Sequence, residues 1–168
     1  MDWLPFDLHP EYPPEGVPRG RLAERYGPGI HEHTRRAIEA AGLTYNPPDV
    51  IPNSRKALEV TELAREAGLH ASVHDRLMHA YWSEGADIGD DDVLIGLVAE
   101  AGLDRADAHA ALEKRRYADR VDASTREAQL NGIHAIPAFV LGKRLLVLGA
   151  QPHELFERAV KQLESASA

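Results

Sequence analysis

The sequence of 168 residues contains no cysteine, no long apolar run and no excess of positive charge. Without cysteine, the chain forms no disulfide, no thiolate metal site and no cysteine nucleophile of its own. Its apolar runs fall well short of the roughly 18–20 residues that a helix needs to span a bilayer. The first residues, 1–5, contain neither the basic nor the apolar segment of a secretory signal, so none is expected.

The balance of charge is acidic. There are 19 Lys and Arg against 27 Asp and Glu, which gives a net charge of −8 at pH 7. Such a balance disfavours nucleic acids and anionic membranes as partners. The hydrophobic share of 43% is that of an ordinary globular protein. At this length we expect one domain, with or without a subdomain.

Alternating residues at the start of the chain predict a strand over residues 2–8. Leu4, Phe6 and Leu8 are apolar and alternate with other residues, which is the period of a strand. Pro5 lies inside this segment and indicates an edge strand, because proline cannot donate to a sheet.

Between residues 19 and 131 the pattern is helical. Ala-Gly-Leu occurs at 41–43, 67–69 and 101–103, which is typical of helix C-termini where glycine adopts a left-handed conformation. The expected helices cover about 20–41 (interrupted near 27–29), 54–67, 70–84, 91–102, 104–115 and 118–131.

After Gly132 the pattern changes to a hairpin and a final helix. Residues 136–141 and 144–148 are predicted strands, with Gly142-Lys143 as a two-residue turn. Pro152 is expected at the first position of the last helix, where its missing N–H costs nothing. Propensity alone favours a trans proline with a structural role at position 137.

Candidates for metal binding and hydrolysis are weak. His70 and His74 lie four residues apart, but no third ligand completes a zinc site. The imidazoles of His31 and His33 would point in divergent directions on a helix. The acidic segment 87–92 lacks the ligand order of a calcium loop, and helix capping explains its aspartates. No nucleophile elbow or glycine-rich phosphate loop occurs. We expect neither a metal nor a cofactor.

Five blocks of sequence resemble the DsbA family of thiol oxidoreductases. Gly-Ile-His-Ala-Ile-Pro-Ala-Phe-Val at 132–140 and the block at 149–156 resemble the C-terminal end of that family. The blocks at 3–8, 53–58 and 80–88 are similar to its FrnE-type dithiol-disulfide isomerase branch, which is cytoplasmic. The resemblance runs in order along almost the whole chain.

The resemblance implies a thioredoxin-like fold interrupted by a helical domain. It implies a cis peptide before Pro137, with the backbone of Ile136 available to an extended substrate by strand addition. It also implies that residues 1–18 and 132–168 form the thioredoxin-like part, and that 19–131 form the inserted helical domain.

One departure from the family concerns its chemistry. The family's catalytic Cys-x-x-Cys lies in a strand–helix unit upstream of the block at 3–8, and this sequence begins at that block. Disulfide exchange needs a reactive thiolate, so these residues alone are expected to be inactive in it. Either the natural start lies upstream, where a GTG valine codon was taken as an initiator, or the chain is a shortened homologue. An in-frame stop directly upstream in the genomic DNA would exclude the first explanation.

The missing unit also affects the sheet, because its strand is central in thioredoxin-like folds. Without that strand, backbone N–H and C=O groups are left exposed, which favours association. We expect the gap to be closed either by residues 2–8 pairing with the 136–141 strand, or by a second subunit in a homodimer.

The sequence therefore predicts an α/β protein with an N-terminally truncated thioredoxin-like fold and an all-helical insertion. The expected site residues are Ile136 and Pro137, for substrate positioning, with no catalytic residue in this chain. The expected partner is a protein or small molecule that carries a thiol or disulfide. Two alternatives stay open: a glutathione-dependent enzyme similar to 2-hydroxychromene-2-carboxylate isomerases, and a non-catalytic peptide-binding or dimeric scaffold.

Overall fold

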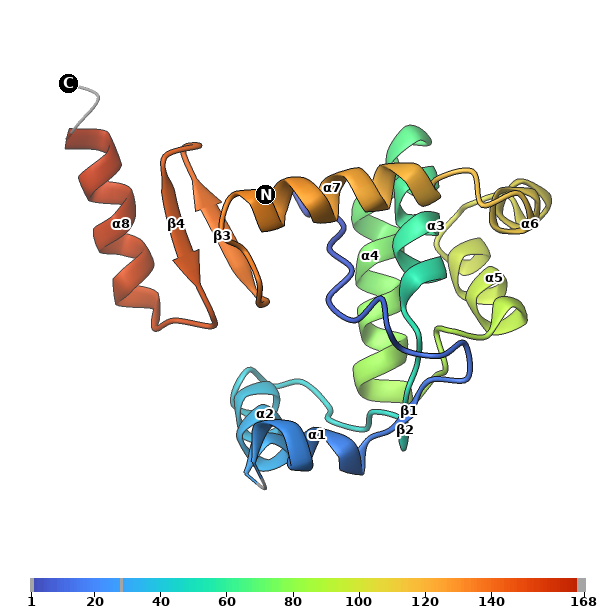
Figure 1. Ribbon diagram of the computed structural model, residues 1–168, viewed down its shortest axis with the longest axis horizontal. Coiled ribbons are helices and arrows are strands. Elements are labelled where there is room, and N and C mark those ends of the chain that lie inside the picture. Colours follow the sequence, from blue (N-terminus) through green and yellow to red (C-terminus); the bar gives the residue numbers. More distant parts are fainter. Residues whose placement is uncertain (1, 28, 166–168) are drawn as a thin grey trace. The chain divides into compact units, whose positions relative to one another are not determined.

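The computed structural model of the protein describes residues 2–27 and 29–165. By their internal contacts the residues form two compact units, Met1–Ser124 and Thr125–Ala168, which are described separately. Figure 1 shows the first unit as mostly helical and the second as a hairpin with helices.

The first unit contains the predicted helices together with a short strand pair. Its elements are β1 (Val17–Pro18), α1 (Gly20–Tyr26), α2 (Ile30–Ala40), β2 (Val50–Ile51), α3 (Arg55–Glu66), α4 (His70–His79), η1 (Ala80–Glu84), α5 (Asp91–Glu100), α6 (Arg105–Glu113) and the first half of α7 (Ala118–Leu130). The interruption expected near 27–29 separates α1 from α2, although Pro28 lies outside the described residues. The helix expected over 70–84 continues past α4 as the π-helical η1, and β1 pairs with β2 antiparallel.

The core of this unit lies among α3, α4, α5 and α6. The side chains of Val60, Val73, Leu94 and Val98 are completely buried. Each comes from a helix whose apolar residues recur at helical spacing, so that one face of each helix turns inward. This core is independent of any sheet.

The three Ala-Gly-Leu segments end helices, as predicted. Gly42, Gly68 and Gly102 all have positive φ angles. The leucine after each glycine donates its N–H to a carbonyl five residues upstream, which is the hydrogen bond of a Schellman motif. These bonds are Leu43 to Ile38 (3.2 Å), Leu69 to Ala64 (2.8 Å) and Leu103 to Val98 (3.0 Å).

The predicted strand over residues 2–8 is wrong. In the part of the chain that the structure describes, this segment pairs with no strand, so its expected pairing with 136–141 is wrong as well. The segment lies instead on the helices of the first unit. The Pro5 carbonyl accepts a hydrogen bond from Ser124 Oγ at 2.7 Å, and the buried Asp7 carboxylate pairs with Arg55 at 3.2 Å. Alternation shows that a segment has two faces, but a strand also needs a neighbouring backbone to bond to.

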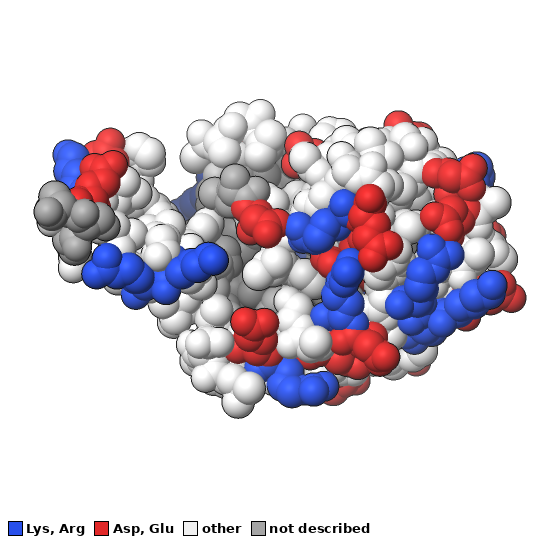
Figure 2. Space-filling model, turned by 90° about the horizontal axis from the view of Figure 1, so that it is seen from above, with Lys and Arg blue, Asp and Glu red and all other residues white. Residues whose placement is uncertain are grey.

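Arg55 at the start of α3 organises a network of charges in this unit. Its guanidinium pairs with Asp7, with Glu59 at 3.1 Å and with Asp122 at 2.6 Å. Burial by itself would lower the pKa of Arg55, but the hydrogen bonds that its guanidinium donates to Asp122, Asp7 and Glu59 outweigh burial and hold that pKa above its ordinary value. Arg115 is a second cation on Glu59, at 2.5 Å. Figure 2 shows that basic and acidic side chains also lie next to one another at the surface, with Lys and Arg in blue and Asp and Glu in red.

The second unit consists of the end of α7, a hairpin and α8 (His153–Ser165). Strands β3 (Ala138–Leu141) and β4 (Leu145–Leu148) pair antiparallel, with Phe139 opposite Val147. The predicted hairpin is confirmed, but β3 begins two residues later and β4 one residue later than expected. Gly142 and Lys143 both have positive φ, and Arg144 N–H bonds to the Leu141 carbonyl at 3.0 Å. Three residues therefore separate the paired ends of the strands.

No helix among the described residues has the length and apolar character that crossing a membrane requires.

Candidate functional site

The two predicted site residues, Ile136 and Pro137, lie together at the start of β3. Gly132 ends α7 with a positive φ, and the chain reaches the strand through the five exposed or half-exposed residues 133–137. The Ile136–Pro137 peptide bond is cis. The Ile136 side chain is 55% exposed, although isoleucine is normally among the most buried residue types. The site is thus an accessible apolar side chain on an accessible stretch of backbone.

The backbone around this site is bonded on one side only. Gly149 N–H bonds to the Pro137 carbonyl at 2.8 Å, so this opposed pair is a hydrogen-bonded one. Hydrogen-bonded and non-bonded pairs alternate along an antiparallel ladder. The register therefore turns the N–H and C=O groups of Ala138 and Val140 away from β4, towards the outer edge of β3. Among the described residues no strand covers that edge.

Helix α8 holds the hairpin from behind. Phe139 on β3 and Phe156 on α8 meet edge to face, with ring centroids 4.9 Å apart. Val147 on β4 and Ala159 on α8 are both buried. Alternation along the strands then leaves Val140 and the opposed Leu146 on the other face, where they are 58% and 37% exposed. Helix α8 therefore covers one face of the hairpin, and β4 pairs with one edge of β3. The outer edge of β3 and the face that carries Val140 are accessible.

Comparison with known proteins identifies the family. The sequence matches the DsbA-like thioredoxin domain over residues 1–161. The chain belongs to this family. The expected resemblance to DsbA-family thiol oxidoreductases is thereby confirmed, while the FrnE-type branch stays a prediction.

Two individual relatives of this DsbA-like chain support the assignment. A probable DsbA oxidoreductase from Streptomyces coelicolor, SCO1869, has a similar structure, with a TM-score of 0.85 and 31% identity. The match covers 94% of this chain and 72% of that one. The uncharacterized protein YwbO of Bacillus subtilis is 30% identical over 163 residues, which are 95% of this chain and 80% of YwbO. These matches confirm the thioredoxin-like fold and place the chain in a family of thiol–disulfide oxidoreductases.

The histidines that sequence reasoning set aside form an aromatic contact in this DsbA-like chain. The rings of His70 and His74 stack with centroids 6.0 Å apart, and Trp3 stacks on His74 at 4.9 Å. Burial and the charge of Arg65, which lies 3.1 Å from His70 Nε2, lower the pKa of His70. No group of three potential metal ligands occurs among the described residues.

The acidic segment 87–92 acts in helix capping, as predicted. Asp90 Oδ1 accepts the N–H of Val93 at 2.9 Å, at the start of α5. Asp87 Oδ1 accepts the N–H of Gly89 at the same distance, 2.9 Å, in the preceding turn. Both carboxylates are therefore engaged with backbone groups of their own segment.

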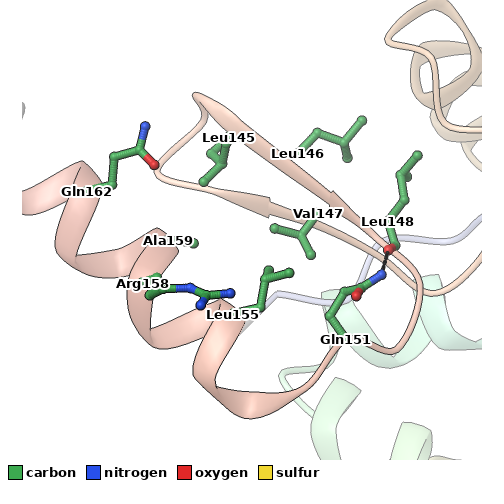
Figure 3. A pocket seen from close by; sticks show the side chains of 9 residues that line it. All are labelled: Leu145, Leu146, Val147, Leu148, Gln151, Leu155, Arg158, Ala159 and Gln162. Carbon is green, nitrogen blue, oxygen red and sulfur yellow. Dashed lines mark hydrogen bonds between the residues drawn. The ribbon is translucent and has the colours of Figure 1, made fainter.

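Sequence reasoning missed two hollows on the surface. One, of about 470 Å³, lies beside Arg19, whose guanidinium bonds to the Pro48 carbonyl at 2.6 Å and to Tyr81 Oη at 2.8 Å. The other, of about 430 Å³, lies between β4 and α8 (Figure 3). The residues that line the first hollow are separated along the chain, so local patterns give no signal for it. An arginine within an apolar helical pattern, Arg158 in α8, is the one local sign of the second.

Proposed function

We propose that this chain holds an extended polypeptide bearing a thiol or disulfide, as a DsbA-like protein does, and supplies no thiol of its own. The single observation that carries the proposal is the exposed Ile136 next to the open outer edge of β3. An extended substrate can pair with unpaired backbone groups, while its side chains contact the exposed apolar ones. Because the sequence has no cysteine, no mixed disulfide can form on these residues. We also propose a cytoplasmic location, as in the FrnE-type branch that the sequence resembles.

The first prediction concerns affinity for an unfolded chain. The S-alkylated B chain of insulin is a suitable probe because it is extended and its cysteines cannot react. Ile136→Ser removes most of the apolar side chain, and we expect it to weaken binding about tenfold, the effect of losing a half-exposed aliphatic contact. Fluorescence anisotropy of the labelled B chain measures the change.

Leu130→Ser is the matched control for this measurement. Leu130 is 83% exposed and also lies in the second unit, but on α7 and outside the hairpin. Its replacement should alter the affinity by less than about twofold. Equal losses for Ile136→Ser and Leu130→Ser would mean that the B chain binds to exposed apolar surface without regard to the hairpin.

We further propose that, without a bound polypeptide, the chain forms a homodimer through the same outer edge of β3, so that the second copy and the polypeptide compete for it. An open strand edge beside exposed apolar side chains favours pairing with another copy. Val140→Pro removes an N–H that points outwards and spares the bonds to β4, because proline lacks only its own donor. We expect dimeric wild-type protein and monomeric Val140→Pro by light scattering at micromolar concentration. A wild-type monomer would refute the dimer, although it would leave the binding of polypeptides intact.

A further inference from the structure

The second edge of the hairpin borders a groove that the proposed function does not use. The groove of about 430 Å³ lies between β4 and α8. Its apolar lining consists of the half-buried Leu145 and Leu155 together with the buried Val147 and Ala159 (Figure 3). The amide of Gln151 lies at one end and that of Gln162 at the other. A strand edge facing a helix across an apolar groove is an arrangement that accepts extended peptides.

The edge of β4 has backbone groups available for such pairing. The alternation that turns Val140 outwards on β3 does the same for the opposed Leu146, and for Leu148, on β4. The Leu148 carbonyl already accepts Gln151 Nε2 at 2.8 Å, as Figure 3 shows. The N–H and C=O of Leu146 and the N–H of Leu148 are left to a ligand, since β4 pairs only with β3 among the described residues.

One charge in the groove has no counterpart. Arg158 lines it, and in Figure 3 its guanidinium lies beside Leu155. Among the described residues no carboxylate forms an ion pair with Arg158, and the neighbouring Glu157 pairs with His153 at 3.5 Å instead. A guanidinium beside an apolar wall forms its strongest contact with a carboxylate, through two parallel hydrogen bonds.

These charges select the occupant. Arg158 is the charged residue of the groove's lining, so a carboxylate complements the groove and a second cation would be repelled from it. An extended peptide that carries a carboxylate satisfies the strand edge, the apolar walls and the cation together.

We propose that the groove between β4 and α8 binds an extended peptide segment of a partner protein, with a carboxylate of that segment held by Arg158. This site is separate from Ile136 and Pro137, because it uses the opposite edge of the hairpin. It would let the chain hold a partner while the outer edge of β3 is engaged.

Three synthetic hexapeptides of alternating threonine and valine test this proposal with the full chain. The first ends in a free carboxylate, the second in an amide, and the third in an amide with glutamate as the last residue. Calorimetry should show the free-acid peptide binding about tenfold more tightly than the plain amide, as expected for one charge-assisted contact. Recovery of affinity by the glutamate peptide would assign the contact to side-chain carboxylates as well as to chain termini.

Two variants make the result specific. Arg158→Gln should weaken binding of the free-acid peptide about tenfold. It should leave the affinity for the plain amide peptide unchanged, because that peptide has no carboxylate to contact Arg158. Lys161→Gln removes the same charge from the same helix but outside the groove, and should alter affinity by less than about twofold. Equal effects of the two variants, or no binding of the free-acid peptide at millimolar concentration, would overturn the proposal.

Amide chemical shifts separate this proposal from the proposed function. The hexapeptide should shift the amide signals of Leu146 and Leu148, and Ile136→Ser should bind it as the wild type does. Shifts confined to residues 136–140 would instead mean that the peptide uses the site at Ile136, which would refute the groove and support the proposed function.

Discussion

Glu59→Gln is expected to lower the free energy of unfolding of the helical unit by about 2 kcal/mol, because it removes a buried negative charge that accepts hydrogen bonds from two guanidinium groups. The Glu59 side chain is 1% exposed and receives hydrogen bonds from Arg55 at 3.1 Å and from Arg115 at 2.5 Å. Glutamine preserves the shape but removes the negative charge that both guanidinium groups share. Urea denaturation followed by circular dichroism at 222 nm measures the effect.

Glu113→Gln is the control for this substitution. Glu113 lies on α6 and is exposed, so loss of its charge should change the free energy of unfolding by less than about 0.5 kcal/mol. If Glu59→Gln were as mild as Glu113→Gln, the network around Arg55 would not stabilise the unit.

The second large effect is expected in the apolar core. Leu94→Ala should destabilise the helical unit by about 3 kcal/mol, through the lost transfer energy and the cavity it leaves. Leu94 on α5 is completely buried, whereas its neighbour Val93 is 37% exposed. Val93→Ala should therefore cost well under 1 kcal/mol in the same denaturation experiment. Similar losses at the two positions would mean that the inner face of α5 is not tightly packed.

The helices could be predicted because their signals are local. Glycine at the end of a helix and aspartate at its start bond to backbone groups within one turn, so Gly68 and Asp90 could be interpreted without knowledge of the fold. The hairpin before α8 was similarly clear. The sequence also indicated Ile136 and Pro137, but only through their resemblance to a family.

The remaining features depend on contacts between distant segments. Residues 2–8 alternate like a strand, yet Asp7 pairs with Arg55 and Pro5 bonds to Ser124. Glu59 and Arg55 are four residues apart and could be paired from sequence, but Arg115 could not. The groove beside β4 could not be predicted either, because α8 packs next to the strand only in the folded chain. Periodicity gives each element two faces and does not say what covers them.

The proposed function requires that the start of β3 hold an extended polypeptide. Titration of the full chain with S-alkylated insulin B chain, followed by amide chemical shifts, tests it most directly. We predict saturable shifts at Ile136, Ala138 and Val140, while the amide signals of the helical unit stay unchanged. Shifts spread over the helical unit with none at these three positions would contradict the claim.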